Sequence, residues 1–238
     1  MIKVRDLYKN FDGQTVLKGI NLDIPDGEIL VVLGESGSGK SVFLKHLVGI
    51  LKPDRGLIEI DGVDITKLSE RDLLRLRKNM GYLFQEGALY DFMTVLENAA
   101  FPLVEHSLLK EPEISKRAKE MLHEVGLEKA MLKFPAQLSG GMRKRAALAR
   151  SVIMNSKFLF CDEPTSGLDP IRSRDITDLI RSIARQIRCT TVVTSHDMRN
   201  AFRFADRLVL IRQGEIVVEG TPATLRESQD RFVQEFLE

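Results

Sequence analysis

The sequence predicts an α/β fold built on a parallel sheet. Residues 29–33, 157–162 and 190–194 are short, almost wholly apolar segments, and helix-like sequence follows each of them. Strands of a parallel sheet are covered on both faces, so they appear as continuous apolar runs and not as alternating patterns. These three runs therefore indicate an α/β core, to which the other elements are added.

The N-terminal part of the chain predicts antiparallel β structure. Residues 2–6, 17–24 and 57–61 alternate in polarity or carry β-branched side chains, and Asp-Gly pairs such as Asp12-Gly13 separate them. Asp-Gly is a common turn pair, because glycine accepts a positive φ without steric cost. We expect these segments to pair with one another in an N-terminal antiparallel β subdomain.

The middle of the chain predicts helices. Residues 111–125 and 140–152 have helical patterns, and Gly126 and Asn155 are suitable stop signals behind them. Ser139 is a good N-cap residue for the second helix, because its hydroxyl can accept a hydrogen bond from a free backbone N–H group. These signals indicate a mostly helical insertion between the strands.

The predicted helical subdomain covers about residues 86–155, and the chain then returns to β structure. Residues 207–211 and 215–219 flank Arg-Gln-Gly at 212–214, which is a hairpin turn signal. No internal repeat, low-complexity tract or obvious linker interrupts the sequence. We therefore expect residues 1–238 to form one domain, with the helical subdomain inserted in its core.

Composition and charge argue against several classes of protein. The chain has 238 residues, 43% of them hydrophobic, with 35 Lys and Arg against 34 Asp and Glu, so disorder is excluded. A net charge of +1 gives little basis for binding a phosphate backbone, and we expect no nucleic acid among the partners. The longest apolar runs are far shorter than the roughly 18 residues of a membrane span.

Two further features fit a cytoplasmic protein. Residues 1–6 already alternate like a strand and leave no room for the apolar region of a signal peptide. Cys161 and Cys189 have neither metal-ligand spacing nor the spacing of a disulfide framework, which fits a reducing compartment. We expect both cysteines to be ordinary buried thiols.

A glycine-rich loop follows the first apolar strand and precedes a helix. It matches the pattern GxxxxGK[ST] with the residues Gly34, Glu35, Ser36, Gly37, Ser38, Gly39, Lys40 and Ser41. Its glycines let successive backbone N–H groups turn inward at a helix N-terminus, where the helix dipole also favours anions. The loop therefore predicts a binding site for nucleotide phosphates.

Two side chains of this loop have predicted roles. Lys40 would reach the β- and γ-phosphates, and the hydroxyl of Ser41 would coordinate Mg²⁺. A purely structural glycine turn has no need of Lys and Ser at these two positions. We therefore predict that a nucleotide binds here together with Mg²⁺.

An acidic pair ends the second apolar strand. Asp162 and Glu163 follow residues 158–161, and the carboxyl ends of strands are where open α/β sheets bind ligands. Asp162 would hold Mg²⁺ through its water shell, and Glu163 would polarise the attacking water as a general base. The alternative is an acidic pair that caps the strand by chance.

Residues 138–142, Leu-Ser-Gly-Gly-Met, indicate a second phosphate-binding surface. Ser139 caps the following helix, and Gly140 and Gly141 leave backbone N–H groups accessible. On its own, a Ser-Gly-Gly helix start is a common cap. The other motifs of the chain decide between these two interpretations.

Several motifs occur in a fixed order along the chain. They are the phosphate loop, Gln85, residues 138–142, the pair Asp162 and Glu163, Ser-Gly-Leu-Asp at 166–169, and His196 after an apolar strand. This set resembles the nucleotide-binding subunit of ATP-binding-cassette (ABC) transporters over essentially the whole chain. The resemblance implies one nucleotide-binding domain with a P-loop NTPase fold, a RecA-like parallel-sheet core and ATP hydrolysis with Mg²⁺.

The resemblance also implies roles for single residues. Phe11 looks like the aromatic residue that stacks on adenine, with Tyr8 as the alternative. Gln85 looks like the residue that links Mg²⁺ and the attacking water to the membrane partner. Asp169 looks like the aspartate of the D-loop, and His196 looks like the switch residue that contacts the γ-phosphate.

Partners follow from the same resemblance. In the implied head-to-tail dimer, Ser139, Gly140 and Gly141 of one copy close over the ATP held by residues 34–41 of the other. Integral membrane permease subunits are the further partners, so we expect a peripheral subunit on the cytoplasmic face of the inner membrane. Hydrolysis removes the γ-phosphate that bridges the two copies.

Finer similarity indicates one branch of the family. Residues 83–90, 93–95 and 98–103 resemble the Mla/MCE-associated branch, whose ATPases drive phospholipid or sterol traffic in double-membrane envelopes. This implies an MCE-domain substrate-binding protein and a small accessory subunit as further partners. Glu86 and Tyr90 depart from the pattern expected for this branch.

Other functions stay open at this stage. The ATPase of an importer for amino acids or another small solute is the sister interpretation, and residues 85–103 bear on the choice of cargo. A soluble ABC ATPase acting on nucleic acid or ribosomes usually carries a coiled-coil or zinc insertion, of which residues 86–137 give no sign. A small-molecule kinase would use the phosphate loop but would leave residues 138–142 and His196 without a purpose.

Two minor features are given structural interpretations. The basic run 143–145 is interpreted as a solvated helix face near the nucleotide. The spacing of Phe232, Phe236 and Leu237 suggests a terminal helix that packs on this domain.

Overall fold

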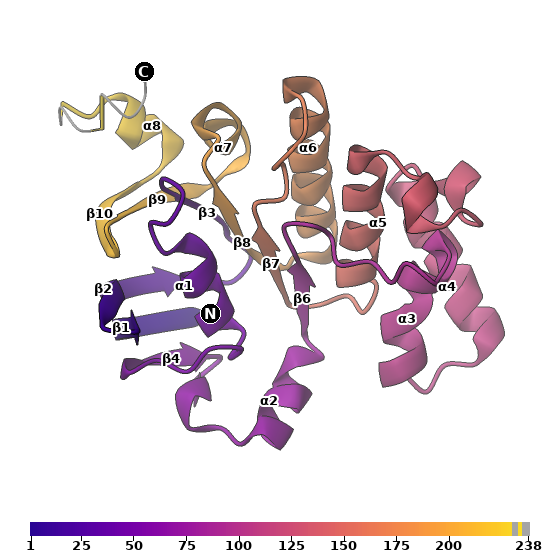
Figure 1. Ribbon diagram of the computed structural model, residues 1–238, viewed down its shortest axis with the longest axis horizontal. Helices are drawn as coiled ribbons and strands as arrows, with labels where there is room; N and C mark the ends of the chain where they lie inside the picture. Colours follow the sequence, from indigo (N-terminus) through magenta and orange to yellow (C-terminus); the bar gives the residue numbers. More distant parts are fainter. Residues whose placement is uncertain (230–232, 235–238) are drawn as a thin grey trace.

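The computed structural model describes residues 1–229 and 233–234, which form two sheets with helices packed against them (Figure 1). The strands are β1 (Ile2–Phe11), β2 (Gln14–Ile24), β3 (Ile29–Leu33), β4 (Arg55–Ile60), β5 (Val63–Asp64), β6 (Met80–Leu83), β7 (Phe158–Asp162), β8 (Thr190–Ser195), β9 (Arg207–Arg212) and β10 (Glu215–Gly220). The helices are α1 (Lys40–Leu47), α2 (Glu70–Arg77), α3 (Val95–His106), α4 (Glu111–Glu124), α5 (Gly140–Val152), α6 (Pro170–Ile187), α7 (Met198–Phe204) and α8 (Pro222–Arg226). The helix predicted from Phe232, Phe236 and Leu237 lies outside the described residues.

The N-terminal strands form an antiparallel sheet, as predicted. Their order is β2-β1-β4-β5. The first strand does not end at Asp6, because a β-bulge absorbs the irregularity: Asp6 adopts a φ of 49°, and the register with β2 shifts between Val4 and Leu7. The strand therefore extends to Phe11 and carries Tyr8 as well.

The second sheet contains the three apolar runs as neighbouring parallel strands, which confirms the predicted α/β core. Its order is β10-β9-β3-β8-β7-β6, and only the β10–β9 pair is antiparallel. The edge strand β6 escapes prediction, because its four residues alternate in burial and include a glycine. The order brings the carboxyl ends of β3, β7 and β8 together at one edge.

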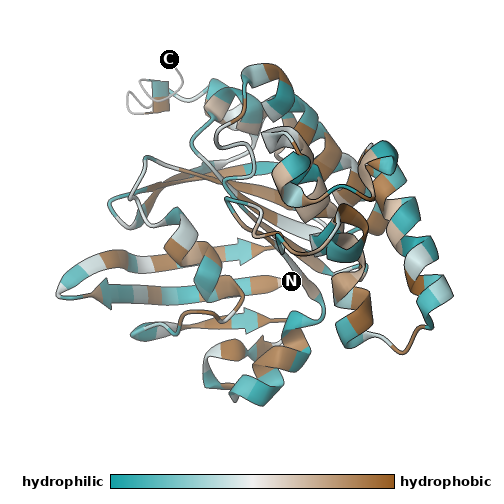
Figure 2. Cartoon of the chain, turned by 45° about the vertical axis from the view of Figure 1, so that its right-hand side comes forward, coloured by the Kyte–Doolittle hydropathy of each residue, from teal (hydrophilic) through white to brown (hydrophobic). Residues whose placement is uncertain are grey.

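Each central strand is buried on both of its faces. In β3, Ile29, Val31 and Leu33 join the apolar core formed with α3 to α7, whereas Leu30 and Val32 join the core shared with α1 and the N-terminal sheet. Figure 2 shows this difference in hydropathy, since the central strands are largely brown and the N-terminal strands alternate. The sheet is therefore packed between two apolar cores, and the carboxyl ends of its central strands have little freedom to move.

Three α-helices, with two short 3-10 helices at Glu128–Ala130 and Pro135–Gln137, fill the insertion between β6 and β7. The predicted helices 111–125 and 140–152 are confirmed as α4 and α5, and Ser139 caps α5 by accepting a hydrogen bond from the N–H of Met142 at 3.4 Å. The helix α3 was not predicted, because Pro102 lies inside it and proline usually ends or kinks a helix. Assignment of residues 1–238 to a single domain stays a prediction.

The end of the chain forms the predicted hairpin. Gln213 and Gly214 connect β9 to β10 with φ values of 49° and 86°, as a two-residue turn with two positive φ angles requires. Cys161 and Cys189 are free and buried, as expected. Among the described residues, no helix is both long and apolar enough to cross a membrane.

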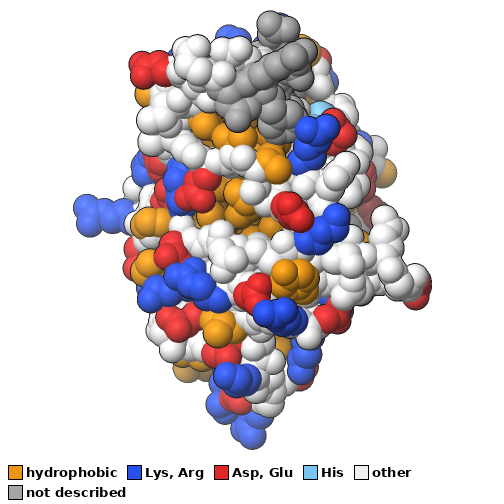
Figure 3. Space-filling view, turned by 90° about the vertical axis from the view of Figure 1, so that its left-hand side faces the viewer, with side chains coloured by type: hydrophobic (Ala, Val, Ile, Leu, Met, Phe, Trp, Pro, Cys, Tyr) orange, Lys and Arg blue, Asp and Glu red, His pale blue; other side chains and the backbone are white. Residues whose placement is uncertain are grey.

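The surface mixes charges of both signs. Figure 3 shows Lys and Arg side chains next to Asp and Glu on one face of the molecule, around a central area of hydrophobic side chains, and the two signs nearly balance in the net charge of +1. The interpretation of residues 143–145 as a solvated helix face is wrong for Lys144. This residue is only 7% exposed, because it is covered by the segment of Gln85 and the turn of Ser166, to which its ammonium group donates hydrogen bonds.

Close packing of α5 on the edge strand β6 gives a test of this fold. A Cβ atom on Gly81 would lie less than 3.0 Å from the carbonyl oxygen of Ser151 in α5. We predict that Gly81→Ala lowers the free energy of unfolding by about 1–3 kcal/mol, because the strand and the helix must separate. Urea unfolding followed by circular dichroism measures this change.

Gly141→Ala is the matched control for Gly81→Ala. A Cβ atom there would have its nearest neighbour, the Arg172 side chain, at 3.7 Å, which is an ordinary contact. Its urea midpoint should be equal to or slightly above that of the parent protein, because alanine is favoured over glycine in a helix. Equal midpoints for both variants would show that α5 does not pack on β6 as described.

Candidate active site

The phosphate loop connects β3 to α1 and is shaped by close backbone contacts. A Cβ atom on Gly34 would lie less than 3.0 Å from the carbonyl oxygen of Ile211, so only glycine fits between the loop and β9. Gly39 stands before the first turn of α1 with a φ of 105°, which side-chain-bearing residues rarely adopt. The loop therefore curls over the N-terminus of α1.

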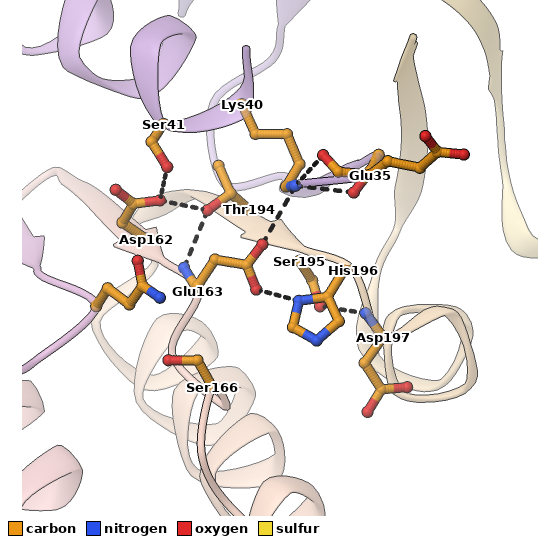
Figure 4. A network of polar contacts seen from close by, with 12 residues as sticks. Glu35, Lys40, Ser41, Asp162, Glu163, Ser166, Thr194, Ser195, His196 and Asp197 are labelled. Carbon is orange, nitrogen blue, oxygen red and sulfur yellow. Dashed lines mark hydrogen bonds and ion pairs between the residues drawn. The ribbon is translucent and has the colours of Figure 1, made fainter. Parts of the chain in front are cut away.

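Lys40 lies folded back under this loop and is 5% exposed. Its ammonium group donates hydrogen bonds to the carbonyl oxygens of Gly34 at 2.8 Å and Glu35 at 3.0 Å, and it pairs with a carboxylate oxygen of Glu163 at 3.3 Å (Figure 4). The Oγ atom of Ser38 in the same loop is buried and has no hydrogen-bond partner. The loop thus holds both a positive charge and an unsatisfied polar atom, which fits an anionic ligand.

Asp162 ends β7 in the centre of the site. One of its oxygens accepts hydrogen bonds from the hydroxyls of Ser41 and Thr194, both at 2.7 Å. Its other oxygen accepts a longer bond of 3.4 Å from the hydroxyl of Tyr82 on β6. Burial and the carboxylate of Asp162 raise the pKa of Tyr82, so this phenol stays neutral and can donate.

Glu163 directly follows Asp162 and adopts a φ of 45°, an uncommon value for a residue with a side chain. Its backbone N–H group donates to the hydroxyl of Thr194 at 3.0 Å. Its carboxylate, on a residue 7% exposed, lies between Lys40 on one side and the Nδ1 atom of His196 at 2.7 Å on the other. The His196 side chain itself is 59% exposed, so one ring edge is held while the rest faces outward.

Thr194 and Tyr82 are the two residues of this network that the sequence analysis missed. Thr194 lies opposite Asp162 in the parallel pairing of β7 with β8. The sequence did contain a signal for Thr194, because a hydroxyl side chain near the carboxyl end of an apolar strand is placed to contact a ligand site. Tyr82 gave no such signal, since its strand was not predicted.

Oxygen atoms of two side chains in the site are suitable ligands for Mg²⁺. The described residues contain no group of three or more His, Cys, Asp or Glu side chains that could hold a metal by themselves. Magnesium takes one or two protein oxygens and completes its shell with phosphates and waters. The Oγ of Ser41 and the carboxylate of Asp162 lie 2.7 Å apart and supply such a pair.

Other predicted site residues lie outside this network. Ser139 and Gly141 line a different depression, of about 200 Å³, together with Arg172 of α6. The depression beside the phosphate loop, of about 230 Å³, is lined by residues 35–38 and 210–213. Within one chain, therefore, the two predicted phosphate-binding surfaces do not share a pocket.

Asp169 and Gln85 have mainly backbone contacts. Asp169 caps α6 by accepting hydrogen bonds from the N–H groups of Ile171 and Arg172. The bond from Arg172 contributes most to lowering the pKa of the Asp169 carboxyl, and the bond from Ile171 acts in the same direction. Gln85 is exposed, and its carbonyl oxygen accepts a hydrogen bond from Lys144.

Phe11 and Tyr8 lie on the N-terminal sheet. Phe11 is 40% exposed, with the ammonium group of Lys9 at 5.3 Å from its ring centre. The ring of Tyr8 is covered by the guanidinium of Arg55 at the same distance of 5.3 Å. Phe11 is thus the more open of the two aromatic rings at the end of β1.

Comparison with known proteins agrees with this arrangement. The profile of the family described as "ABC transporter" matches residues 17–166. The chain is 43% identical over 236 residues to the probable ribonucleotide transport ATP-binding protein mkl of Mycobacterium leprae (strain TN), covering 99% of this chain and 68% of that protein. It is 38% identical over 237 residues to the intermembrane phospholipid transport system ATP-binding protein MlaF of Haemophilus influenzae (strain ATCC 51907), covering 100% of this chain and 90% of that protein.

A solved structure is similar over most of the chain. The ATP-binding cassette MJ0796, in a dimeric post-hydrolysis state bound to ADP and Pi, superimposes with a TM-score of 0.87 and 32% sequence identity. The match covers 93% of this chain and 99% of that one. Together with the family profile, it confirms the predicted P-loop NTPase fold with its RecA-like core and inserted helical subdomain. The chain belongs to the ABC transporter family, as an ATP-binding and ATP-hydrolysing cassette.

Proposed function

We propose that this ATPase subunit drives lipid transport of the Mla/MCE type, from the cytoplasmic face of the inner membrane. The observation that carries the proposal is the 38% identity to MlaF, which spans this whole chain and 90% of that phospholipid transport protein. The mkl protein is similar over 68% of its own length. Because that protein is named for ribonucleotide transport, a small polar solute is the second candidate cargo.

The proposed hydrolysis step uses Glu163 as the general base. Its carboxylate is held from two sides, by the ammonium of Lys40 and by the ring of His196. Such a buried and doubly oriented carboxylate can polarise a water molecule directed at the γ-phosphate. Lys40 would exchange its loop carbonyl partners for phosphate oxygens, which are stronger acceptors because they are charged.

Ser41 and Asp162 are the proposed holders of Mg²⁺, which when bound neutralises charge on the phosphate oxygens. Asp162 is kept in place by the hydroxyls of Thr194 and Tyr82, so its free lone pairs point in a fixed direction. Gln85 is the proposed third contact to the metal. Phe11 is the proposed platform for adenine, since its exposed ring can stack on a base.

A second copy of the chain is proposed to complete the site. Ser139, Gly140 and Gly141 form the start of α5, and Ser139 and Gly141 line a depression separate from the one beside the phosphate loop of their own chain. A helix N-terminus favours phosphate groups. The dimeric state named for the MJ0796 structure supports a head-to-tail pair, in which this helix and Asp169 meet the nucleotide of the other copy.

The permease is proposed to dock in a groove next to Gln85. This groove, of about 470 Å³, lies between β6 and α3 and is lined by aromatic side chains and by basic ones. The aromatic set is Tyr82, Phe84, Tyr90 and Phe101, and the basic set is Arg77, Lys78 and Arg150. A helix of the permease with apolar and acidic side chains matches this lining.

Purification of the intact membrane assembly tests the proposed cargo. We expect this chain to co-purify with permease subunits, an MCE-domain protein and phospholipid, which proteomic and lipid mass spectrometry would identify. Recovery of a solute-binding protein and no MCE-domain protein would contradict the lipid proposal and favour the small-solute alternative. The same assembly purified with the Glu163→Gln variant serves as the control. It should contain the same subunits, because this change does not affect folding of the complex.

Removal of the proposed base should stop catalysis without loss of binding. We predict that Glu163→Gln lowers the turnover of ATP by about 10²–10⁴-fold, because general-base catalysis is lost while the shape of the side chain is kept. Phosphate release measures turnover, and size-exclusion chromatography with ATP should detect a trapped dimer. Turnover at the parent rate would refute the assignment of Glu163 as the base.

Blocking the second phosphate surface should separate binding from hydrolysis. We predict that Ser139→Arg leaves ATP binding to the single chain intact but abolishes turnover, because the added side chain fills the space required by the nucleotide of the other copy. Fluorescent-nucleotide titration and phosphate release measure the two effects. Unchanged turnover would exclude a site shared between two copies.

Ser69→Arg is the matched control for Ser139→Arg. Ser69 caps α2 by accepting a hydrogen bond from the N–H of Asp72, just as Ser139 caps α5. Either change removes a helix cap, which costs about 0.5–2 kcal/mol of stability. Only the change at Ser139 should affect turnover.

A further inference from the structure

Lys144 is a buried cation within the insertion. Its side chain is 7% exposed and extends from α5, two positions after Met142. Burial of an ammonium group is unfavourable unless hydrogen bonds and charges compensate for it, and an apolar side chain of similar size would avoid that cost. The structure therefore needs a reason for a lysine at this position other than packing.

The ammonium group of Lys144 joins three segments that are distant in the sequence. It donates to the backbone carbonyl oxygen of Gln85, which follows β6, and to the hydroxyl of Ser166 at 3.4 Å. Ser166 lies in the turn between β7 and α6, and Lys144 itself lies on α5. One charge thus connects the segment of Gln85, the helix capped by Ser139, and the turn that follows Glu163.

The rest of the loop after Gln85 also rests on α5. Arg150 donates to the carbonyl oxygens of Gly87 at 2.9 Å and Ala88 at 2.7 Å. Gly87 adopts a φ of 79°, which glycine does freely. Ala88 adopts a φ of 47°, which is uncommon for a residue with a side chain, so Arg150 holds the turn at its least favourable residue. A Cβ atom on Gly87 would lie 3.3 Å from the Cβ of Ala147 in α5. Arg150 holds the far part of the loop, and the N–H of Gly87 closes the turn around Gln85 by donating to the carbonyl oxygen of Phe84 at 2.8 Å. Lys144 ties the Gln85 carbonyl to α5.

The other contact of Lys144 supports the turn that carries Glu163. The N–H group of Ser166 donates to the carbonyl oxygen of Glu163 at 3.1 Å, which closes this turn. Glu163 sits in it with its φ of 45°, so its side-chain direction depends on the turn being held. Figure 4 shows Ser166 on the side of Glu163 that is opposite to Lys40.

Nearby carboxylates stabilise the charged form of the buried Lys144 ammonium group. Burial lowers the pKa of Lys144, and the carboxylates of Glu86, Glu163 and Asp162 act in the opposite direction. The positive charge of Arg143, the preceding residue, also lowers the pKa of Lys144. The positive charge therefore sits in the field of the same two carboxylates that form the proposed site.

We propose that Lys144 is a positioning residue for ATP hydrolysis, whose ammonium group holds the Gln85 backbone and the Glu163 turn at a fixed separation. Lys144 does not touch the substrate. It acts through Gln85 and Glu163, so that the amide of one and the carboxylate of the other address the same γ-phosphate. The inference rests on the proposed roles of these two residues.

Kinetics of three variants in the intact membrane assembly test this role. In Lys144→Met, we expect kcat to fall by about tenfold or more while KM for ATP changes by less than about twofold, because misplaced catalytic groups slow the chemical step and leave binding intact. The Mg²⁺ concentration for half-maximal turnover should rise, since Gln85 is displaced. Lys144→Arg should recover most of kcat, because it keeps a cation with several donors.

Lys129→Met is the matched control, because Lys129 is an exposed lysine of the same insertion. It should retain the parent kcat and Mg²⁺ dependence. A Lys144→Met protein with parent kcat and parent Mg²⁺ dependence would overturn the inference, and so would a Lys144→Arg protein no more active than Lys144→Met. If Lys144→Met does not fold, as judged by circular dichroism, Lys144→Gln replaces it with the same criteria.

Glu163→Gln measured in parallel separates this inference from the proposed function. If Glu163→Gln keeps its turnover, the assignment of the base fails, and the role of Lys144 falls with it. If Glu163→Gln is inactive while Lys144→Met hydrolyses ATP like the parent, only the role of Lys144 is refuted.

Discussion

The buried contact between Lys40 and Glu163 is the interaction around which the site is built. Their charged groups lie 3.3 Å apart, and both residues are less than a tenth exposed. Burial of two charges is favourable only when further hydrogen bonds satisfy the remaining donors and acceptors. The carbonyl oxygens of Gly34 and Glu35 do this for the lysine, and His196 does it for the glutamate.

This pairing explains why three parallel strands must end at the same place. Lys40 follows the loop after β3, Glu163 follows β7, and His196 follows β8. The parallel register between β7 and β8 places Thr194 opposite Asp162, where its hydroxyl serves both acidic residues. Apolar cores on both faces of the sheet keep these strand ends in register, so the charged groups are held without much freedom.

The helical insertion adds a second set of contacts to this edge. Cations of α5 bind the backbone of the segment after β6, with Lys144 near Gln85 and Arg150 near Gly87. The start of the same helix lines a depression separate from the one beside the phosphate loop. One helix therefore contacts a loop of its own chain and also begins with the residues proposed to meet the nucleotide of a second copy.

Local patterns in the sequence determined the apolar strands, the phosphate loop and the cap at Ser139, because each of these depends on residues a few positions apart. They also identified Glu163 as a candidate, since it follows an apolar strand, whereas the role of His196 came from the order of motifs that the chain shares with ABC transporters. Tertiary structure alone decided that these two side chains meet at 2.7 Å, that Thr194 and Tyr82 bind Asp162, and that Lys144 is buried within a run that looks solvated. Such contacts join residues separated by many positions in the chain, and they depend on strand order, register and the face a helix turns to the sheet, which periodicity does not encode.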